Sequence, residues 1–155
     1  MAEFPTKSPG EVVTAADWNQ IEDYVDAMRP RATFSDPEVT VTSAMGTTDV
    51  GDPVTDVVIG PSGRVLLALS FHFEFDGGAS SSAVFGRAVY SGPDSGTTST
   101  FVWGRNSPTD FRKSVQAQFI QSGLTPGTYS FQPRISVSSN EAEFRLVTIT
   151  ATPLP

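Results

Sequence analysis

The amino-acid sequence predicts a mostly β protein, a jelly-roll-like β-sandwich preceded by one short α-helix that forms a trimeric stem. Three observations support this prediction. Hydrophobic residues are 38% of the 155-residue chain and charged residues only 17%, with Gly, Ser, Thr and Pro abundant, which disfavours a helical bundle and wholesale disorder. Several segments alternate apolar and polar residues between turn signals. One segment alone, near the start, has helical periodicity.

The clearest strand signal is the segment 65–75, in which every second residue is apolar and after which Asp76-Gly77-Gly78 forms a turn. The segment that begins at Gly127 repeats this alternation. Pro133 within it cannot donate a backbone hydrogen bond, so we expect this strand to lie at an edge or to contain a bulge. About eight strands at this spacing are typical of a sandwich or jelly roll. The further strands are expected at 38–43, 54–59, 82–91, 99–104, 112–121 and 141–152.

The segment 13–30 is predicted to be the helix. Thr14 is a suitable N-cap, and Asp17 three residues later completes an approximate capping box. Arg29 suits the negative end of the helix dipole, and Pro30 ends the helix. Apolar residues spaced three, four and three positions apart form a heptad seam: Trp18, Ile21, Val25 and Met28.

Two interpretations of this seam are open at the level of sequence. In the first, the helix packs against its own β-domain. In the second, which we prefer, three copies of the chain bury their seams together as a trimeric stem. Isolated helices shorter than about 12–15 residues are only marginally stable in water, so a helix this short must bury its seam against another surface. The strand-rich segment is long enough to close its own core, which leaves the helix free to meet its copies.

The segment 1–12 contains two prolines, a glycine and an isolated phenylalanine, and is predicted to be an extended arm. The chain therefore divides into the arm at 1–12, the helix at 13–30 and the β-sandwich at 31–155. Prolines restrict the free arm, so less entropy is lost when it docks on a partner. A disordered tail is the alternative. The candidate docking residues are Phe4, Pro5, Lys7 and Pro9.

Charge and composition exclude several classes of partner. The formal net charge is −7, from 17 acidic and 10 basic residues, so nucleic acid and anionic membrane surfaces would be repelled. The chain contains no cysteine, which excludes disulfides and thiolate chemistry. We find no signal-peptide pattern and no apolar run near the about 20 residues that span a bilayer. We therefore expect a soluble protein made in the cytoplasm.

Residues that could carry chemistry are few and scattered, so we expect neither an enzyme nor a cofactor. His72 is the single histidine and is expected on the polar or interface face of its strand, with no G-x-S-x-G motif elsewhere. Carboxylates that could serve glycoside hydrolysis are dispersed among strands and turns. The acidic segment 49–56 lacks the spacing of a calcium loop and is interpreted as a solvated loop, so no metal site is predicted.

Two aromatic residues are candidates for stacking against a ligand, Trp103 and Tyr90. The ring of Trp103 belongs either to the core or to an exposed position near a loop, where it would stack on a sugar or a protein. We prefer the core interpretation for Trp103.

Two parts of the chain resemble one family. The segment "SPGEVVTAADWNQIEDYV" resembles the opening of small trimeric virion structural proteins of actinobacterial tailed phages. The segments "PSGRVLLALSFHF", "SGLTPGTYSFQPRISV" and "FRLVTITATPLP" resemble the β-domain of the same proteins, and the resemblance covers most of the chain. It implies a trimeric jelly roll, similar to tumour-necrosis-factor or C1q heads, on a virion surface. Members are identified variously as head decoration, fibre or minor tail proteins.

Our leading functional hypothesis is a homotrimeric decoration knob on a phage capsid or virion surface. Its partners would be its own copies and the major capsid protein or another virion lattice, held through the arm. Almost nothing separates Pro30 from the first strand, which favours a compact knob over a long fibre. The alternative is a tail-tip or tail-fibre head, a minor tail protein for host attachment that binds a cell-surface glycan. A free carbohydrate-binding module is the third hypothesis.

Overall fold

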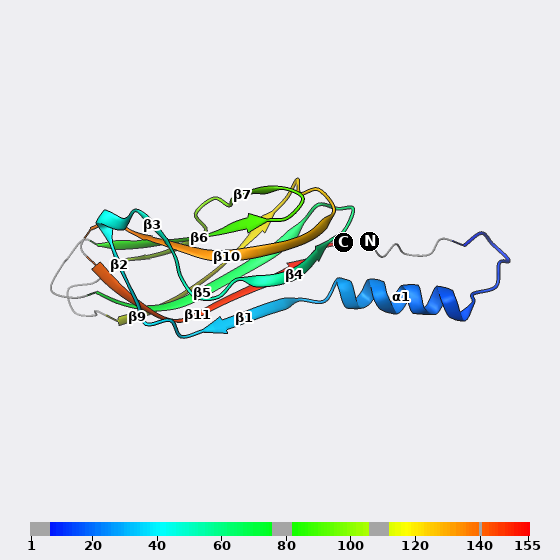
Figure 1. Ribbon diagram of the computed structural model, residues 1–155, viewed down its shortest axis with the longest axis horizontal. Coiled ribbons are helices and arrows are strands. Elements are labelled where there is room, and N and C mark those ends of the chain that lie inside the picture. Colours follow the sequence, from blue (N-terminus) through cyan, green and yellow to red (C-terminus); the bar gives the residue numbers. More distant parts are fainter. Residues whose placement is uncertain (1–6, 76–81, 106–111, 140) are drawn as a thin grey trace.

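The protein is an antiparallel two-sheet sandwich with one α-helix at its end (Figure 1). The computed structural model describes residues 7–75, 82–105, 112–139 and 141–155, with only the backbone of Arg112. Within these ranges the elements are α1 (Ala15–Ala27), β1 (Arg31–Ser35), β2 (Val39–Thr42), the 3₁₀ turn η1 (Ser43–Met45), β3 (Thr47–Asp49), β4 (Val54–Ile59), β5 (Val65–Phe75), β6 (Ala83–Ser91), β7 (Ser95–Thr97), β8 (Val102–Arg105), β9 (Arg112–Gln121), β10 (Gly127–Val137) and β11 (Glu141–Pro153).

Sheet I contains β1, β11, β5 and β9 in that order, and β2 pairs with the same edge of β11 as β1 does. The 13 residues of β11 are long enough for both partners: its first part pairs with β2 and its second part with β1. Between these parts the register against β5 shifts, and Leu146 adopts a positive φ of 50°. Both Arg145 and Leu146 are exposed at this bulge, which is the usual effect of one extra residue in a strand.

Sheet II contains β3, β10, β6 and β7 in that order, with β4 also paired to β10 and β8 to β6. The strand β10 is therefore interior, and the expectation that it lies at an edge is wrong. The carbonyl of Pro133 accepts a hydrogen bond of 3.0 Å from the backbone N–H of Val50, between β3 and β4. In an antiparallel strand the nitrogen and carbonyl of one residue point toward the same neighbouring strand. The nitrogen of Pro133 therefore also faces the segment between β3 and β4, where the pairing with β10 is interrupted. The expected irregularity is present nearby, as a register shift between Tyr129 and Phe131.

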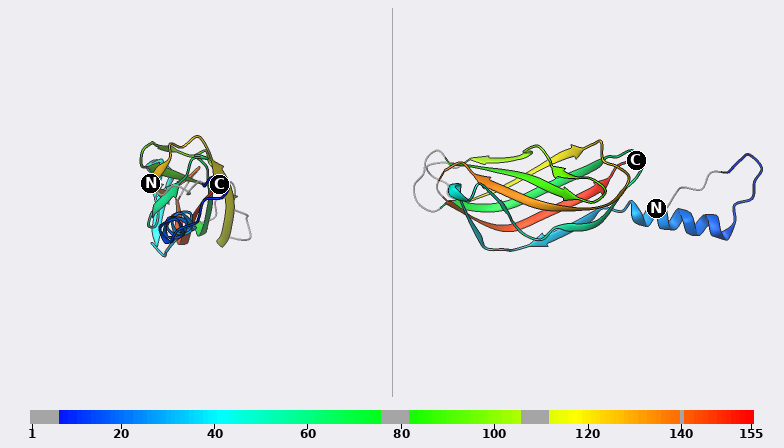
Figure 2. Two further views of the ribbon diagram at one scale, coloured as in Figure 1. Left: turned by 90° about the vertical axis from the view of Figure 1, so that its right-hand side faces the viewer. Right: turned by 45° about the horizontal axis from the view of Figure 1, so that its top comes forward.

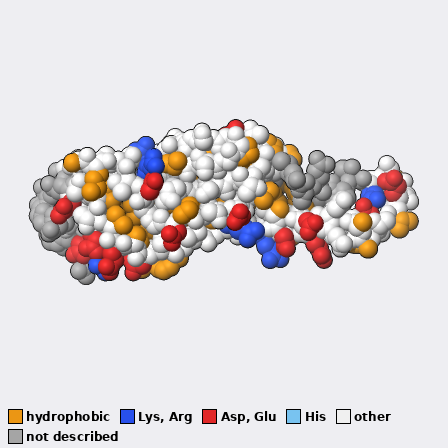
Figure 3. Space-filling view, in the orientation of Figure 1, with side chains coloured by type: hydrophobic (Ala, Val, Ile, Leu, Met, Phe, Trp, Pro, Cys, Tyr) orange, Lys and Arg blue, Asp and Glu red, His pale blue; other side chains and the backbone are white. Residues whose placement is uncertain are grey.

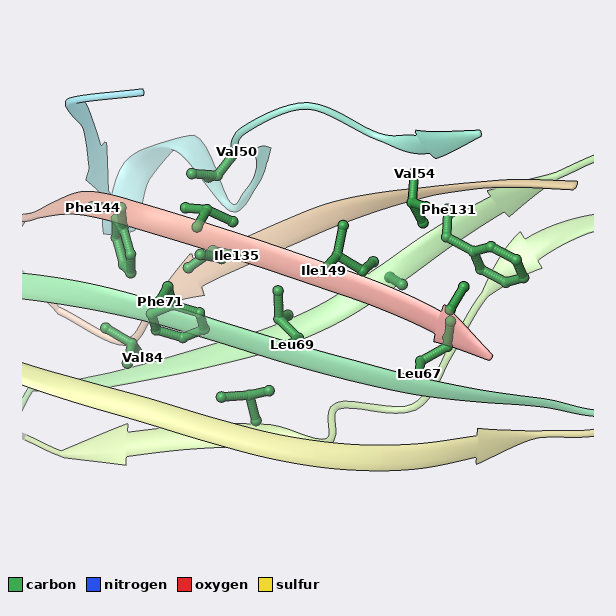
Figure 4. Close-up of a cluster of buried hydrophobic side chains, with 14 of the residues drawn as sticks. Val50, Val54, Leu67, Leu69, Phe71, Val84, Phe131, Ile135, Phe144 and Ile149 are labelled. Atoms are coloured by element: carbon green, nitrogen blue, oxygen red, sulfur yellow. The ribbon is translucent and has the colours of Figure 1, made fainter. Parts of the chain in front are cut away.

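The core lies between the two sheets and is built from the predicted alternations. All six alternate residues of β5 from Val65 to Phe75 are at most 2% exposed. Figure 4 shows side chains of β5 and β11 pointing toward those of sheet II. The ring centroids of Phe71 and Phe144 are 5.4 Å apart at 67°, an edge-to-face arrangement that adds stabilisation beyond burial.

The predicted fold class, a mostly β sandwich with one short N-terminal helix, is confirmed. Strands appear at every predicted position, although the one expected at 99–104 spans Val102–Arg105. Three strands were not predicted: β1, β3 and β7.

The helix α1 extends the long axis of the sandwich and does not cover either sheet (Figures 1 and 2). The last strand, β11, finishes at the end of the sandwich where α1 joins it. No helix in the described part of the chain has the length and apolar character needed to cross a bilayer.

Candidate functional site

The helix begins with the predicted capping box. The hydroxyl oxygen of Thr14 accepts a hydrogen bond of 3.3 Å from the backbone N–H of Asp17, whose carboxylate accepts bonds of 2.6 and 2.7 Å from the backbone N–H and hydroxyl of Thr14. The hydrogen bond from the Thr14 backbone, then those from its hydroxyl and from Lys7, lower the pKa of Asp17 to about 2. The start of α1 is therefore fixed by its own side chains.

The predicted seam lies open to solvent. Trp18 is 59% and Val25 is 52% exposed, while Ile21 and Met28 are half-buried. Met28, at the C-cap, lies against Gly60 of the sandwich, but the rest of the helix projects away from it (Figure 1). The interpretation in which α1 packs against its own β-domain is therefore wrong. Among the described residues, the part of the seam before Met28 does not pack against the sandwich.

The arm can be followed from Lys7. The amino group of Lys7 lies 3.0 Å from the carboxylate of Asp17, and Glu11 accepts a hydrogen bond of 2.7 Å from the backbone N–H of Ser8. Pro9 lies in the turn that these contacts close. Lys7 therefore pairs with a side chain at the start of the helix, and its role in docking the arm on a particle stays a prediction. The candidates Phe4 and Pro5 lie outside the described residues.

The outer face of sheet I carries three consecutive rows without a charged side chain. Cross-strand pairing places these residues side by side on one face. Phe34 is 63% and Ile120 is 46% exposed, and most of the other side chains are small. We call this set the neutral face: Thr152, Leu66 and Ile120 in the first row, Ala32, Thr150, Ala68 and Gln118 in the second, and Phe34, Thr148, Ser70 and Gln116 in the third.

Charged side chains, most of them acidic, lie beyond the neutral face at the end of the sandwich away from α1. Glu74 of β5 is paired directly with Glu143 of β11. Arg145, on the bulge, forms ion pairs with Glu143 and with Glu38, the latter at 3.0 Å. Figure 3 shows the acidic side chains clustered at this end. The neutral face is therefore bounded by an acidic rim.

His72 lies on the same outer face, as expected for its strand. Its Nδ1 is 3.0 Å from the hydroxyl of Ser114 on β9, and Arg145 is its cross-strand neighbour on β11. Within the described ranges, no group of three or more His, Asp or Glu side chains is arranged to hold a metal ion.

The two stacking candidates differ in their exposure to solvent. Trp103 is 60% exposed on the outer face of sheet II, so its assignment to the core is wrong. Tyr90 is paired with Phe131, and its ring centroid lies 6.2 Å from that of Phe131 and 6.3 Å from that of Tyr129. Tyr90 packs against the core from the inner face and is not placed to stack on an external ligand.

The Leu-Thr-Pro-Gly turn has a structural role that the sequence did not reveal. The carboxylate of Asp94, between β6 and β7, accepts hydrogen bonds from the backbone and hydroxyl of Thr125. The hydroxyl of Tyr129 lies 2.7 Å from Asp94 and 2.9 Å from the carbonyl of Thr125. Burial, and then the hydrogen bond to Asp94, raise the pKa of Tyr129 to about 12. These contacts connect two turns at one end of the sandwich.

Comparisons with solved structures show the same architecture. A chain of infectious bursal disease virus, Gx strain, aligns with a TM-score of 0.52 and 9% identity over 81% of this chain and 33% of that chain. The Eiger TNF of S. frugiperda aligns with a TM-score of 0.48 and 12% identity over 82% and 94% of the two chains. The CBM22-1 xylan-binding domain of Xyn10C from Paenibacillus barcinonensis aligns with a TM-score of 0.46 and 9% identity over 79% and 95%.

The chain thus spans about a third of the length of the viral chain it matches. At such identities the likeness shows the fold alone, a two-sheet β-sandwich of the jelly-roll kind. No protein-family model and no curated protein sequence matches the chain.

Proposed function

We propose that the chain is a homotrimeric structural protein of a virion, a decoration knob on the capsid or virion surface of an actinobacterial tailed phage. One observation carries the self-association: the described residues leave two surfaces largely exposed, the seam of α1 and the neutral face of sheet I. Only residues 28–30 separate α1 from β1, which contributes Phe34 to the neutral face. The two surfaces therefore belong to neighbouring elements and can be buried in one assembly.

The energetics favour assembly through these surfaces. The sandwich already closes its own core, so a partner is not needed for the domain to fold. Each large apolar side chain of the seam that becomes fully buried would contribute about 1.5–3 kcal/mol. The neutral face can be covered without separating any charge from water, which removes the main cost of burying a polar surface.

The virion assignment is supported by the resemblance of the Thr-Ala-Ala-Asp-Trp-Asn segment and of the β-domain to virion structural proteins. The fold shared with a chain of infectious bursal disease virus agrees with this assignment. The family resemblance favours three copies, and the heptad spacing of the seam is that of a helical bundle.

Native mass spectrometry of the purified chain tests the self-association. We expect a species of three chains at micromolar concentration. A chain that stays monomeric at this concentration would contradict the proposal. Light scattering on the same sample provides an independent mass.

Attachment to the particle is proposed to use the arm. Deletion of residues 2–10 leaves the Thr14 cap and the seam in place, so the trimer should persist while binding to particles is lost. The substitution Asp17→Asn is the control, because it weakens the ion pair with Lys7 and keeps every residue of the arm. If the truncated chain decorates particles at normal occupancy, the anchor lies in the helix or the sandwich.

The second candidate is a tail-tip or tail-fibre head that binds a host surface glycan. The exposure of Trp103 on sheet II favours it, because an exposed indole ring is suited to stacking. Cryo-electron microscopy of the particle separates the two candidates by copy number. Decoration requires very many copies, whereas a tail element requires only a few.

A further inference from the structure

The outer face of sheet II differs in chemistry from the neutral face. Pairing places Trp103 of β8 beside Phe85 of β6, and Phe85 beside Ser136 of β10. Their sequence neighbours Val84, Val102 and Ile135 are buried, so these three side chains point away from the core. Trp103 is 60% exposed, which leaves a large aromatic surface in contact with solvent.

Cationic side chains surround this aromatic pair. Arg87 follows Phe85 by two residues on the same face and is paired directly with Arg134 of β10. Arg105 follows Trp103 by two residues on β8, and the amino group of Lys113 donates a hydrogen bond of 3.0 Å to the Arg105 carbonyl. Diagonal neighbours in a sheet are about 7–8 Å apart, so long side chains from these positions reach the rim of Trp103.

The positive charge of this face is only partly neutralised. Arg134 forms an ion pair with Asp49. In the part of the chain that the structure describes, the side chains of Arg87 and Arg105 form no ion pair, and the buried Nε of Arg87 has no hydrogen-bond partner. Like charges directly opposite one another destabilise a sheet, and a buried donor without a partner is costly. An anion that bound at the exposed side of these guanidinium groups would offset the repulsion between Arg87 and Arg134.

A ligand of this face must contact both the exposed indole ring of Trp103 and the guanidinium groups of Arg87 and Arg105. A pyranose ring offers an apolar face for stacking on the indole, and a carboxylate accepts paired hydrogen bonds from a guanidinium. The hydroxyls of Ser136 and Thr47 lie in the same row as Phe85 and suit the hydroxyls of a sugar. The overall charge of −7 opposes the binding of any polyanion, so binding here must depend on the local arginines and on stacking against Trp103.

We propose that the outer face of sheet II, centred on Trp103, Arg87 and Arg105, binds a polysaccharide that carries carboxylate groups. This site uses the opposite sheet from the neutral face and does not depend on the proposed trimer or its virion role.

Isothermal titration of the full chain with polygalacturonate tests this site, with uncharged dextran and single-stranded poly-dT as comparison ligands. We expect binding to polygalacturonate alone, weakening as salt is added. Trp103→Ala should lower the affinity about tenfold, and Arg105→Gln by about threefold or more. Arg64→Gln is the matched charge control, because Arg64 is an exposed arginine outside this face, and it should bind like the unmodified chain.

Three results would overturn the proposal: no binding of polygalacturonate, equal binding of dextran or poly-dT, or an equal loss in Arg64→Gln and Arg105→Gln. Circular dichroism of each variant verifies that it is folded, and both key positions are exposed, so folding should be retained. Native mass spectrometry on the same samples reports the trimer separately. A failure of glycan binding is thus distinguishable from a failure of assembly.

Discussion

The sandwich buries most of its apolar side chains within one chain, whereas the seam of α1 is only partly buried. The alternate residues of β5 are at most 2% exposed, while Trp18 and Val25 are more than half exposed. The two regions are nevertheless joined by residues 28–30 alone. This contrast predicts that folding and the proposed assembly depend on different side chains. Substitutions in the core should lower the free energy of unfolding, and substitutions in the seam should lower the free energy of association.

The largest effect is expected for Phe144→Ala. Phe144 is fully buried, with its ring centroid 5.4 Å from that of Phe71 and 6.2 Å from that of Phe73. Removing the ring leaves a cavity and should lower the free energy of unfolding by about 3–5 kcal/mol, measured by denaturant titration. Met45→Ala is the control, since Met45 is 57% exposed, and it should change stability by less than about 0.5 kcal/mol. Similar losses in both variants would refute the assignment of the core.

The seam should control association and leave the sandwich intact. Trp18→Ala and Ile21→Ala each remove a seam side chain, so each should weaken assembly by about 1.5–3 kcal/mol per chain. Analytical ultracentrifugation measures this loss as a shift of the assembly to higher concentration. Asn19→Ala and Glu22→Ala, on the outside of the helix, should have little effect. Equal damage from the two sets of substitutions would mean that the heptad register is wrong.

The hydroxyl of Tyr129 should stabilise the sandwich at neutral pH. Tyr129→Phe removes its contacts with Asp94 and Thr125 and should lower the free energy of unfolding by about 1–3 kcal/mol. The pKa of Tyr129 is raised from 10.0 to about 12, so the folded state favours the neutral phenol. The contribution is complete below pH 10 and is lost as the pH rises through about 12. Denaturant titrations at several alkaline pH values should show this loss in the unmodified chain and not in Tyr129→Phe.

The smallest effect is expected at the helix cap. Thr14→Ala removes the capping hydroxyl and should destabilise α1 by about 0.5–2 kcal/mol, measured by amide hydrogen exchange in its first turn. The pKa of Asp17 is lowered from 3.8 to about 2, so the folded state favours the carboxylate. Its contribution is complete well above pH 3.8 and is lost as the pH falls toward 2. Protection in the sandwich should be unchanged; a loss there would show that α1 and the sandwich are coupled.

The long strands were predictable because their burial follows the period of two in the sequence. The strand β1 was not, because its five residues are mostly exposed and are held by pairing with β11. The strands β3 and β7 have three residues each and no apolar pattern, so only their neighbours define them. The helix and its cap were predictable because both depend on local sequence.

The surface sites were harder to predict because they depend on what fills the interior. A Cβ added to Gly86 would lie 3.0 Å from the ring of Phe71, and one added to Gly104 would lie 2.8 Å from the ring of Phe73. The rings of β5 therefore occupy the space inside β6 and β8. This turns the neighbouring Phe85 and Trp103 outward, although their hydrophobicity alone favours the core. The neutral face was equally hard to predict from the sequence, since small residues in a strand suit either the interior or an interface.

The position of the chain ends matters for engineering. The strand β11 finishes beside α1, whereas η1, between β2 and β3, lies at the opposite tip of the sandwich (Figure 1). A peptide fused after Pro155 would therefore emerge next to α1 and, in the proposed trimer, compete with neighbouring copies for space. A peptide inserted at Ala44, which is exposed, would emerge at the tip. The natural position for presenting a foreign epitope on this scaffold is thus an internal turn and not the terminus.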